Sequence, residues 1–274
     1  MDARTFLGLQ GTHNPYRWLL PVEPGVCTPA GFLFGGCGLG AGIAALEGTT
    51  GRPVVWATCQ YISYARPPEV VDIDVTVSVS GHQTSQARAV AHVADREVFT
   101  VNAALGSRPL EHEGIWAQMP EVPPPSMCRE QERFDTGGSW LHDRLSMRLA
   151  SARGFDELPG DPMPGGRSAL WARLPEVLDM SAAALAVLGD YVPFGIGQAL
   201  GIHAGGNSLD NTLRLGRIVP TEWVLLDIRL HQIVNGFAHG DVFLWSESGS
   251  LLACASQSTI VRMWKDAPVG GEKQ

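Results

Sequence analysis

Residues 35–48 (GGCGLGAGIAALEG) contain only small and apolar side chains up to Glu47. A segment with no polar face is typical of a helix that is buried on every side. Its glycines disfavour a helix by roughly 1 kcal/mol each relative to alanine, so close packing against a neighbour must compensate. We therefore predict a central helix with a sheet packed tightly against it. The helix is expected to end near residues 47–50, where Gly48 and Gly51 can terminate it.

Period-two patterns predict strands around this helix. Residues 5–10 (TFLGLQ) precede it and are predicted to form a first strand. After the helix, residues 69–80 alternate hydrophobic Val71, Ile73 and Val75 with polar positions, which is typical of a half-buried strand. Similar patterns cover residues 53–65, 85–94 and 98–105. These segments follow one another closely, so we predict a meander of four consecutive antiparallel strands.

The second half of the chain repeats this order. Strand-like residues 140–150 and 167–174 precede an apolar, alanine-rich segment that begins at residue 179. We predict a second buried helix there, capped by Asp179 or Ser181 and kinked at Pro193 toward residue 200. Four more strand-like segments follow, at residues 208–215, 222–233, 236–245 and 251–263. One helix for about five strands leaves one face of each sheet uncovered, so we expect those faces to meet each other or a partner subunit.

A polar, proline-rich segment separates the two halves. With 274 residues, the chain is long enough for two units of the usual size of ~150 residues. We predict an N-terminal unit at residues 1–112, a linker at 113–131, a C-terminal unit at 132–265 and a tail at 266–274.

Composition narrows the class of function. A net charge of −8 without a basic cluster argues against a nucleic-acid partner. No apolar run reaches the ~18 residues of a membrane span, and the N-terminus lacks the pattern of a signal peptide, so we expect a cytoplasmic protein without a membrane span. The five cysteines are scattered and show no metal-ligand spacing. We therefore predict no disulfide framework, no metal and no cofactor.

Several motifs in a fixed order resemble the acyl-CoA thioesterase II family of tandem hot-dog proteins. In the first half they are FGG at residues 34–36, SYARP at 63–67 and GHQTSQARAV at 81–90. In the second half they are NSLDN at 207–211, EWVL at 222–225 and the segment from Gly249 to Arg262. The resemblance covers nearly the whole chain except the linker and the tail. It implies an α+β double hot dog, in which two antiparallel sheets each wrap around a central buried helix, and it implies acyl-CoA as the substrate.

The resemblance also implies how the thioester is hydrolysed. A water is activated by an Asp, a Thr or Ser, and a Gln, all from the second hot dog. The Asp of the SLD motif falls on Asp210, and the Gln of the last strand falls on Gln257. The hydroxyl position falls on His231 or Gln232, because the strand after residue 223 reads DIRLHQIV.

The residues themselves support this set to different degrees. Asp210 lies in an uncharged stretch (GGNSLDNTL), which favours a functional carboxylate over the alternative of a turn-forming residue. Gln257 lies among small and apolar residues, where it is either a site residue or a hydrogen-bonding core residue. Gln232 shares a strand face with Leu230 and is the better candidate for a core-side water. His231 shares the polar face with Arg229, and the alternative is that it acts as a base.

Further residues are candidates for binding the substrate. The backbone amides at the helix start, Gly35, Gly36 and Cys37, can hold a carbonyl or a phosphate. The family usually has Gln at the position of Cys37, and we interpret this cysteine as a packing residue, with a nucleophile as the alternative. Arg66 and Arg88 are candidates for the CoA phosphates, the alternative being ordinary surface arginines.

Two other functions stay open at this point. One is a non-catalytic acyl-CoA or acyl-binding protein that keeps the groove without the water-activating set. The other is a hot-dog hydratase or dehydratase, suggested by HNP at residues 13–15 and PGV at 24–26. Double hot dogs often pair through exposed sheet edges, so the resemblance also implies a homo-oligomer. The acyl chain length and the pathway cannot be predicted from the sequence.

Overall fold

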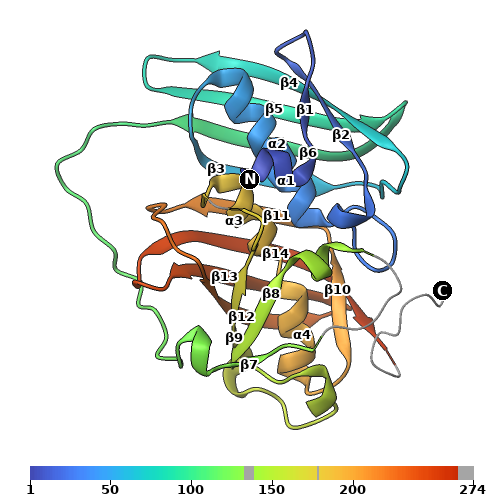
Figure 1. The fold of residues 1–274 in the computed structure, drawn as a ribbon, viewed down its shortest axis with the longest axis vertical. Helices are drawn as coiled ribbons and strands as arrows, with labels where there is room; N and C mark the ends of the chain where they lie inside the picture. Colours follow the sequence, from blue (N-terminus) through green and yellow to red (C-terminus); the bar gives the residue numbers. More distant parts are fainter. Residues whose placement is uncertain (133–138, 178, 265–274) are drawn as a thin grey trace.

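The structure, a computed structural model, describes residues 1–132, 139–177 and 179–264. Figure 1 shows two halves stacked on each other, with the first half of the chain above and the second below. Their strands form one antiparallel sheet with the order β1-β2-β4-β5-β6-β3-β11-β14-β13-β12-β9-β8-β7, and β10 pairs separately with β14. Strands β3 and β11 join the halves at the centre.

The first half contains two helices and six strands within the described residues. They are α1 (Ala3–Leu7), β1 (Gln10–Gly11), β2 (Arg17–Pro21), α2 (Gly35–Thr50), β3 (Val54–Tyr61), β4 (Val70–Ser80), β5 (Thr84–Val93) and β6 (Arg96–Gly106). The second half contains β7 (Arg129–Glu130), β8 (Ser146–Ser151), β9 (Arg167–Arg173), α3 (Ala182–Leu188), α4 (Val192–Leu200), β10 (Ala204–Ser208), β11 (Asp210–Leu215), β12 (Val224–Val234), β13 (Phe237–Ser246) and β14 (Leu251–Met263). Short 3-10 turns lie at Pro24–Val26, Pro125–Met127, Leu141–Arg144, Phe155–Glu157 and Pro164–Gly166.

The two halves repeat one topology, as predicted. The order β2-β4-β5-β6-β3 in the first half corresponds to β9-β12-β13-β14-β11 in the second, and the core helices follow β2 and β9 respectively. Each half of the sheet wraps around its helix (Figure 1). This is the α+β double hot-dog arrangement expected from the sequence.

The predicted meander is wrong in one pairing. Strand β3 pairs with β6, and β4 pairs with β2, so β3 and β4 are not neighbours. The segment between them contains Arg66, Pro67 and Pro68 and carries the chain across the sheet. Because β3 ends up at the edge of the first half, it can pair with β11 and unite the two halves.

The predicted first strand at residues 5–10 is also wrong, because α1 occupies its first half. The Asp2 carboxylate caps this helix by accepting a hydrogen bond from the Thr5 N–H, and Gly8 ends it in the left-handed conformation. Phe6 and Leu7 are thereby buried against the core. The local capping signals outweigh the strand propensity of the segment.

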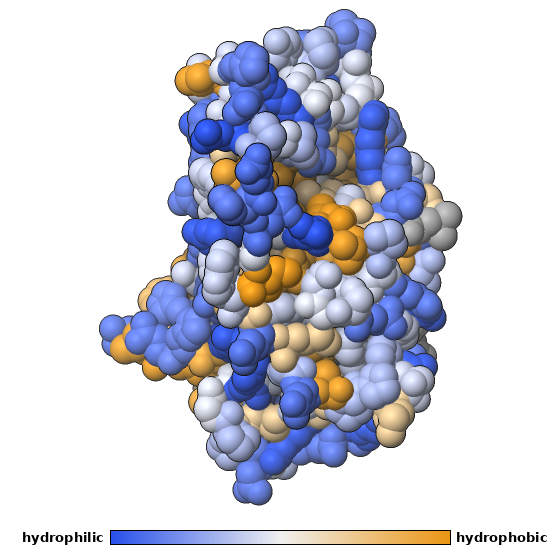
Figure 2. Space-filling model, turned by 90° about the vertical axis from the view of Figure 1, so that its left-hand side faces the viewer, coloured by the Kyte–Doolittle hydropathy of each residue, from blue (hydrophilic) through white to orange (hydrophobic). Residues whose placement is uncertain are grey.

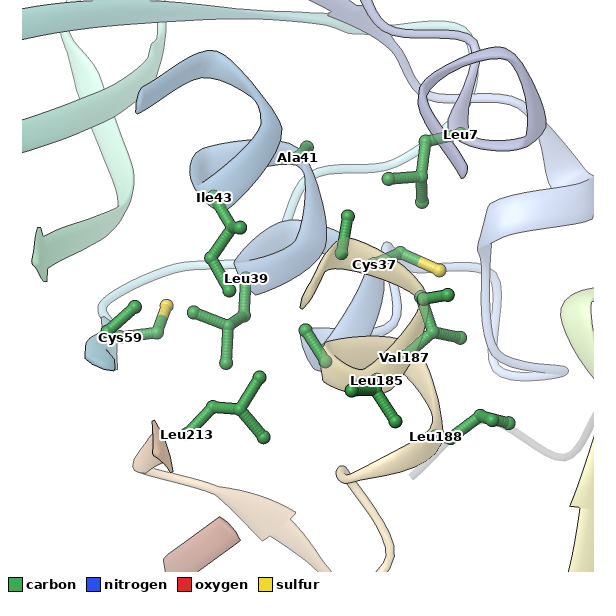
Figure 3. Packing of buried hydrophobic residues seen from close by; sticks show 14 of the residues in the cluster. Leu7, Cys37, Leu39, Ala41, Ile43, Cys59, Leu185, Val187, Leu188 and Leu213 are labelled. Carbon is green, nitrogen blue, oxygen red and sulfur yellow. The ribbon is translucent and has the colours of Figure 1, made fainter. Parts of the chain in front are cut away.

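The glycines of α2 permit close packing on two sides. A Cβ on Gly38 or Gly42 would lie 3.2 Å and 2.7 Å from side-chain atoms of Phe99 and Val101 in β6. This confirms the predicted approach of a sheet. A Cβ on Gly40 would lie 2.9 Å from the Ala183 carbonyl oxygen of α3, so the other side of α2 packs on the helix of the second half. Figure 3 shows α2 and α3 side by side, and Leu39 of α2 and Leu185 of α3 belong to the same buried cluster.

The second buried helix is divided in two. Of the two predicted caps, Ser181 is the one that caps α3. Its Oγ accepts a hydrogen bond from the Ala184 N–H. Residues 189–191 then break the helix, and Pro193 lies in the first turn of α4. The stretch Ala182–Leu200 is long and apolar enough to cross a membrane, but 72% of it is buried within the fold, so it is a core element.

The connection between the halves covers part of the outer sheet face. Ala117, Met119 and Val122 pack against a cluster that includes Trp171, and the Trp171 Nε1–H donates to the Pro123 carbonyl oxygen at 2.9 Å. The outer face expected to meet a partner is therefore partly covered by the chain's own linker. The boundaries 1–112, 113–131 and 132–265 stay predictions, and the tail at 266–274 lies outside the described residues.

Candidate active site

A cavity of about 410 Å³ lies where the two halves meet. The start of α2 and the end of β3 contribute one wall, and the α3–α4 break and residues 206–209 contribute another. Its lining is mostly apolar and rich in aromatic rings, from Phe32, Phe34, Tyr61, Tyr64, Phe99, Tyr191 and Phe194. A cavity of this size and character is typical of a small-molecule site.

Among the residues that the structure describes, Asp190 is the one carboxylate that lines this cavity. It lies in the break between α3 and α4 and is 5% exposed. Its Oδ2 accepts a hydrogen bond from the Gly36 N–H at 2.6 Å, and its Oδ1 accepts one from Ser208 Oγ at 3.2 Å. Burial raises the pKa of Asp190 from 3.8 to about 6, although the hydrogen bonds from Gln257, Gly36 and Ser208 favour the ionised form.

Gln257 connects this carboxylate to the neighbouring strand and helix. Its Oε1 accepts a hydrogen bond from the Val192 N–H at 3.0 Å. Its Nε2 donates to Ser208 Oγ at 2.9 Å and also to Asp190 Oδ1. With its amide oxygen bound to a backbone N–H, its NH₂ group must point at the other two side chains. Gln257 is therefore a buried hydrogen-bonding residue that also belongs to the site.

The structure thus brings together an Asp, a Ser and a Gln from the second half. These are the three side-chain types that the resemblance implies, but two of the three positions differ from those we predicted. The carboxylate comes from Asp190 rather than Asp210, and the hydroxyl comes from Ser208 rather than from residue 231 or 232.

Asp210 lies beside this cluster but does not join it. Its Oδ1 accepts a hydrogen bond from the Ser258 N–H at 2.8 Å, and its backbone pairs with Gln60 across the junction of the halves. It does not line the cavity. The structure therefore gives Asp210 a role in holding β11 against β14.

His231 and Gln232 are both exposed and lie away from the cavity. The His231 Nε2 lies 2.8 Å from the Asp241 Oδ2. A register shift between Leu230 and Gln232 makes His231 an extra residue in β12. The bulge reverses the alternation of the strand, so the prediction that Gln232 faces the core is wrong.

The helix start is partly as expected. Gly35 lines the cavity, while the Gly36 N–H is bound to Asp190. Cys37 is fully buried, and its burial raises the pKa of the thiol well above its usual range. A buried neutral thiol is a poor nucleophile, so the packing interpretation of Cys37 fits the structure.

The two candidate arginines lie in different places. Arg66 lies next to the cavity, because its guanidinium is 5.9 Å from the ring centres of both Phe32 and Tyr64, which line it. Its Nη1 donates to the carbonyl oxygens of residues 30 and 31. Arg88 is exposed in the middle of β5, 4.0 Å from Glu97, and is not part of the cavity wall. Only Arg66 is placed to meet a ligand in this cavity.

Sequence reasoning missed Asp190 and Ser208. Asp190 is the only charged residue between residues 182 and 200, and that isolation was the available signal. Ser208 precedes Leu209-Asp210 directly, so the predicted motif adjoins the cluster, although the residue selected from it, Asp210, is bonded to the Ser258 N–H instead.

The chain is similar to known thioesterases in sequence and in fold. The sequence model described as acyl-CoA thioesterase C-terminal domain matches residues 120–261, just over half of the chain. Among solved structures, a candidate thioesterase from Novosphingobium aromaticivorans is 32% identical, with a TM-score of 0.82 over 92% of this chain and 97% of that one. No curated protein matched the sequence.

Two more distant structures share the fold. A hot-dog protein of unknown function from Alicyclobacillus acidocaldarius is 20% identical, with a TM-score of 0.82 over 97% of this chain and 98% of that one. An acyl-CoA thioesterase II from Mycobacterium marinum is 18% identical, with a TM-score of 0.73 over 96% and 99%. With its double hot-dog fold and a matching C-terminal domain, the chain belongs to the acyl-CoA thioesterase II family and is a thioester hydrolase.

Proposed function

We propose that this enzyme hydrolyses acyl-CoA by means of a water that Asp190 activates, with Ser208 and Gln257 holding the carboxylate in place. The observation that carries the proposal is a single desolvated carboxylate, bonded to a hydroxyl and an amide, in the wall of an apolar cavity. This set of polar groups favours hydrolysis over the alternative of an acyl-binding protein without a water-activating set.

The environment of Asp190 suits a general base. With a pKa of about 6 the carboxylate is mostly ionised at neutral pH, yet it is more basic than an ordinary aspartate. The water oxygen attacks the carbonyl carbon while its proton passes to Asp190. When the tetrahedral intermediate collapses, the C–S bond breaks and the CoA sulfur leaves with that proton. The carboxylate is then ionised again.

The cavity determines where the two parts of the substrate lie. The acyl group enters the apolar part, where Leu33, Val98 and Phe99 form the wall beside α2. The CoA moiety extends outward past Phe32 and Tyr64, where the Arg66 guanidinium can meet a phosphate. Phe99 is 1% exposed and packs against Gly38, so it closes the cavity along the helix and limits the length of the acyl group.

The test is release of CoA thiol from a panel of acyl-CoAs. The Asp190→Asn variant should lose about 10²- to 10⁴-fold in kcat, the usual contribution of a general base. Asp210→Asn is the matched control, because Asn keeps an oxygen for the Ser258 N–H and lies outside the cavity. It should retain activity within about threefold. If Asp190→Asn stays active while Asp210→Asn is inactive, the assignment is wrong.

We further propose that the enzyme is a cytoplasmic homo-oligomer that acts in lipid metabolism. Four of the five free cysteines are buried, which suits a reducing compartment. Figure 2 shows hydrophobic residues gathered around the middle of one face. Ile62 and Tyr64 are about half exposed near the junction of the halves. Light scattering of the purified protein tests the assembly, and a monomer at all concentrations would exclude it.

A further inference from the structure

Aromatic rings are concentrated at the candidate active site. The chain contains nine Phe and four Tyr residues, and seven of these line the cavity. Phe34, Tyr191 and Phe194 pack against the core but stay partly exposed, and all three belong to the cavity wall. A ligand in the cavity would therefore contact ring surface on several sides.

Two of these rings, one from each half of the chain, lie beside Asp190, and we call Phe34 and Tyr191 the inner ring pair. Tyr191 follows Asp190 directly in the break between α3 and α4. Phe34 precedes α2, and a Cβ on Gly36 would lie 2.8 Å from Phe34 Cε1 and 3.0 Å from Asp190 Cβ. The centres of the two rings are 6.4 Å apart, and the ring planes make an angle of 59°. An acyl group held at the base would meet this pair close to its carbonyl.

A second pair of rings lies on the side of the cavity that we assign to the CoA moiety. The ring centres of Phe32 and Tyr64 are 4.7 Å apart, and Tyr64 is 48% exposed. The Arg66 guanidinium lies 5.9 Å from both ring centres. These rings can contact the CoA part of any substrate, whereas the inner ring pair contacts the acyl part.

The size of the cavity suits a compact acyl group. An apolar cavity of ~150 Å³ is enough to hold a benzene ring. The cavity of about 410 Å³ therefore has room for an aromatic ring, the thioester and the adjoining end of the CoA moiety. A long alkyl chain would have to pass Phe99, which is 1% exposed and packs closely on Gly38.

We propose that the preferred acyl group carries an aromatic ring close to the thioester carbonyl, as in an arylacetyl-CoA, and that the inner ring pair contacts this ring. The inference rests on the proposed function, and the hydrolysis itself is unchanged. Aromatic rings attract one another in tilted and offset arrangements, because the positive edge of one ring meets the negative face of the other. A saturated ring of the same size buries similar apolar area but cannot make this contact. The inner ring pair therefore favours an aromatic acyl group over a saturated one.

Release of CoA thiol from three substrates measures this preference. Phenylacetyl-CoA and cyclohexylacetyl-CoA share one carbon skeleton and differ only in the aromaticity of the ring, and octanoyl-CoA has the same number of acyl carbons in an open chain. The preference is the ratio of the kcat/KM values. The value for phenylacetyl-CoA should exceed each of the other two by about threefold or more. A smaller ratio against either substrate would overturn the inference.

Two variants test whether the inner ring pair causes the preference. Phe34→Leu and Tyr191→Leu each remove a ring but keep an apolar side chain. Each should lower the ratio of kcat/KM for phenylacetyl-CoA over cyclohexylacetyl-CoA by about threefold. Both substrates are measured on the same variant, so a loss of folded protein or a displaced base affects them alike and leaves the ratio unchanged.

Phe32→Leu is the matched control, because Phe32 also lines the cavity but lies on the CoA side. It should change kcat/KM for both substrates alike and keep their ratio. An unchanged ratio in both inner variants, or an equal fall in Phe32→Leu, would refute the role of the inner ring pair. If Asp190→Asn is inactive and the wild type shows no preference for phenylacetyl-CoA, only this inference fails; if Asp190→Asn is active, the proposed function fails.

Discussion

Replacing Asp190 with Asn should change how the stability of the protein depends on pH. The carboxyl group has a pKa of about 6 in the folded protein and an ordinary value of 3.8. Each pKa unit corresponds to 1.36 kcal/mol, so the shift of about two units corresponds to about 3 kcal/mol of stability. The shift comes from desolvation, because Asp190 is buried between α3, α4 and the start of α2.

The direction follows from which state binds more protons. Between pH 3.8 and about 6, the folded protein keeps a proton on Asp190 that the unfolded chain has released. Stability therefore falls as pH rises through this range. Below this range the buried carboxyl is protonated and causes no loss of stability, and above it the loss of stability is complete. Asp190→Asn removes this titration. Any loss of hydrogen bonds in the variant shifts its stability by the same amount at every pH.

Urea unfolding followed by tryptophan fluorescence measures this effect. Between pH 4 and pH 7.5, the free energy of unfolding of the wild type relative to Asp190→Asn should fall by about 2.5 kcal/mol, because the unfolded carboxyl is already partly ionised at pH 4. Asp156→Asn is a control, because the hydrogen bond from Arg129 lowers the pKa of Asp156. The ionised Asp156 carboxylate stabilises the fold fully above the ordinary pKa of an aspartate, and this stabilisation is lost only as pH falls below that value. The difference in free energy of unfolding between the wild type and Asp156→Asn should therefore stay nearly constant between pH 4 and pH 7.5. If the Asp190→Asn difference varies by less than about 1 kcal/mol, the carboxylate is not desolvated as the structure shows.

Three further predictions follow from the site and its support. The kcat/KM of the wild type should fall tenfold per pH unit below about 6, because protonated Asp190 cannot accept a proton, and a flat profile would contradict its role as base. Ser208→Ala should lower kcat about tenfold, whereas Ser208→Thr keeps the hydroxyl and should stay within about threefold; equal loss in both would show that the hydroxyl is not what matters. Gly40→Ala should destabilise the protein by about 1–2 kcal/mol in urea unfolding, because the clash with the Ala183 carbonyl exceeds the gain in helix propensity, and a stabilised variant would contradict the close contact of α2 and α3.

Local patterns in the sequence predicted most of the elements. The helix expected at residues 35–48 extends over Gly35–Thr50, and Gly51 ends it with a φ of 66°. The strands expected at residues 69–80 and 251–263 correspond to β4 and β14. These predictions succeeded because the burial of each residue is determined by the face of its own element. The α1 segment failed because a cap at Asp2 and a terminator at Gly8 override its strand-like composition.

Pairing between distant segments could not be predicted in the same way. The neighbour of β3 is β6 on one side and β11 on the other, although β4 follows it in the chain. The bulge at His231 likewise depends on the partner strand β13, and it moved Gln232 from the expected core face to the surface. A register that depends on a partner strand leaves no mark in the local pattern.

The candidate site shows why the cluster around Asp190 was harder to predict from the sequence than the place of Gln257. Gln257 lies on β14 among small and apolar residues, and this local composition made it a candidate either for the site or for a hydrogen bond in the core. Asp190 acquires its neighbours only when α3 packs against α2, and that contact requires glycine at residues 36 and 40. The Gly36 N–H and Asp190 belong to opposite halves of the chain, yet they form one hydrogen bond in the cavity wall. The small residues that weaken α2 as a helix are therefore the same residues that let α3 approach closely enough to place Asp190 in the cavity wall.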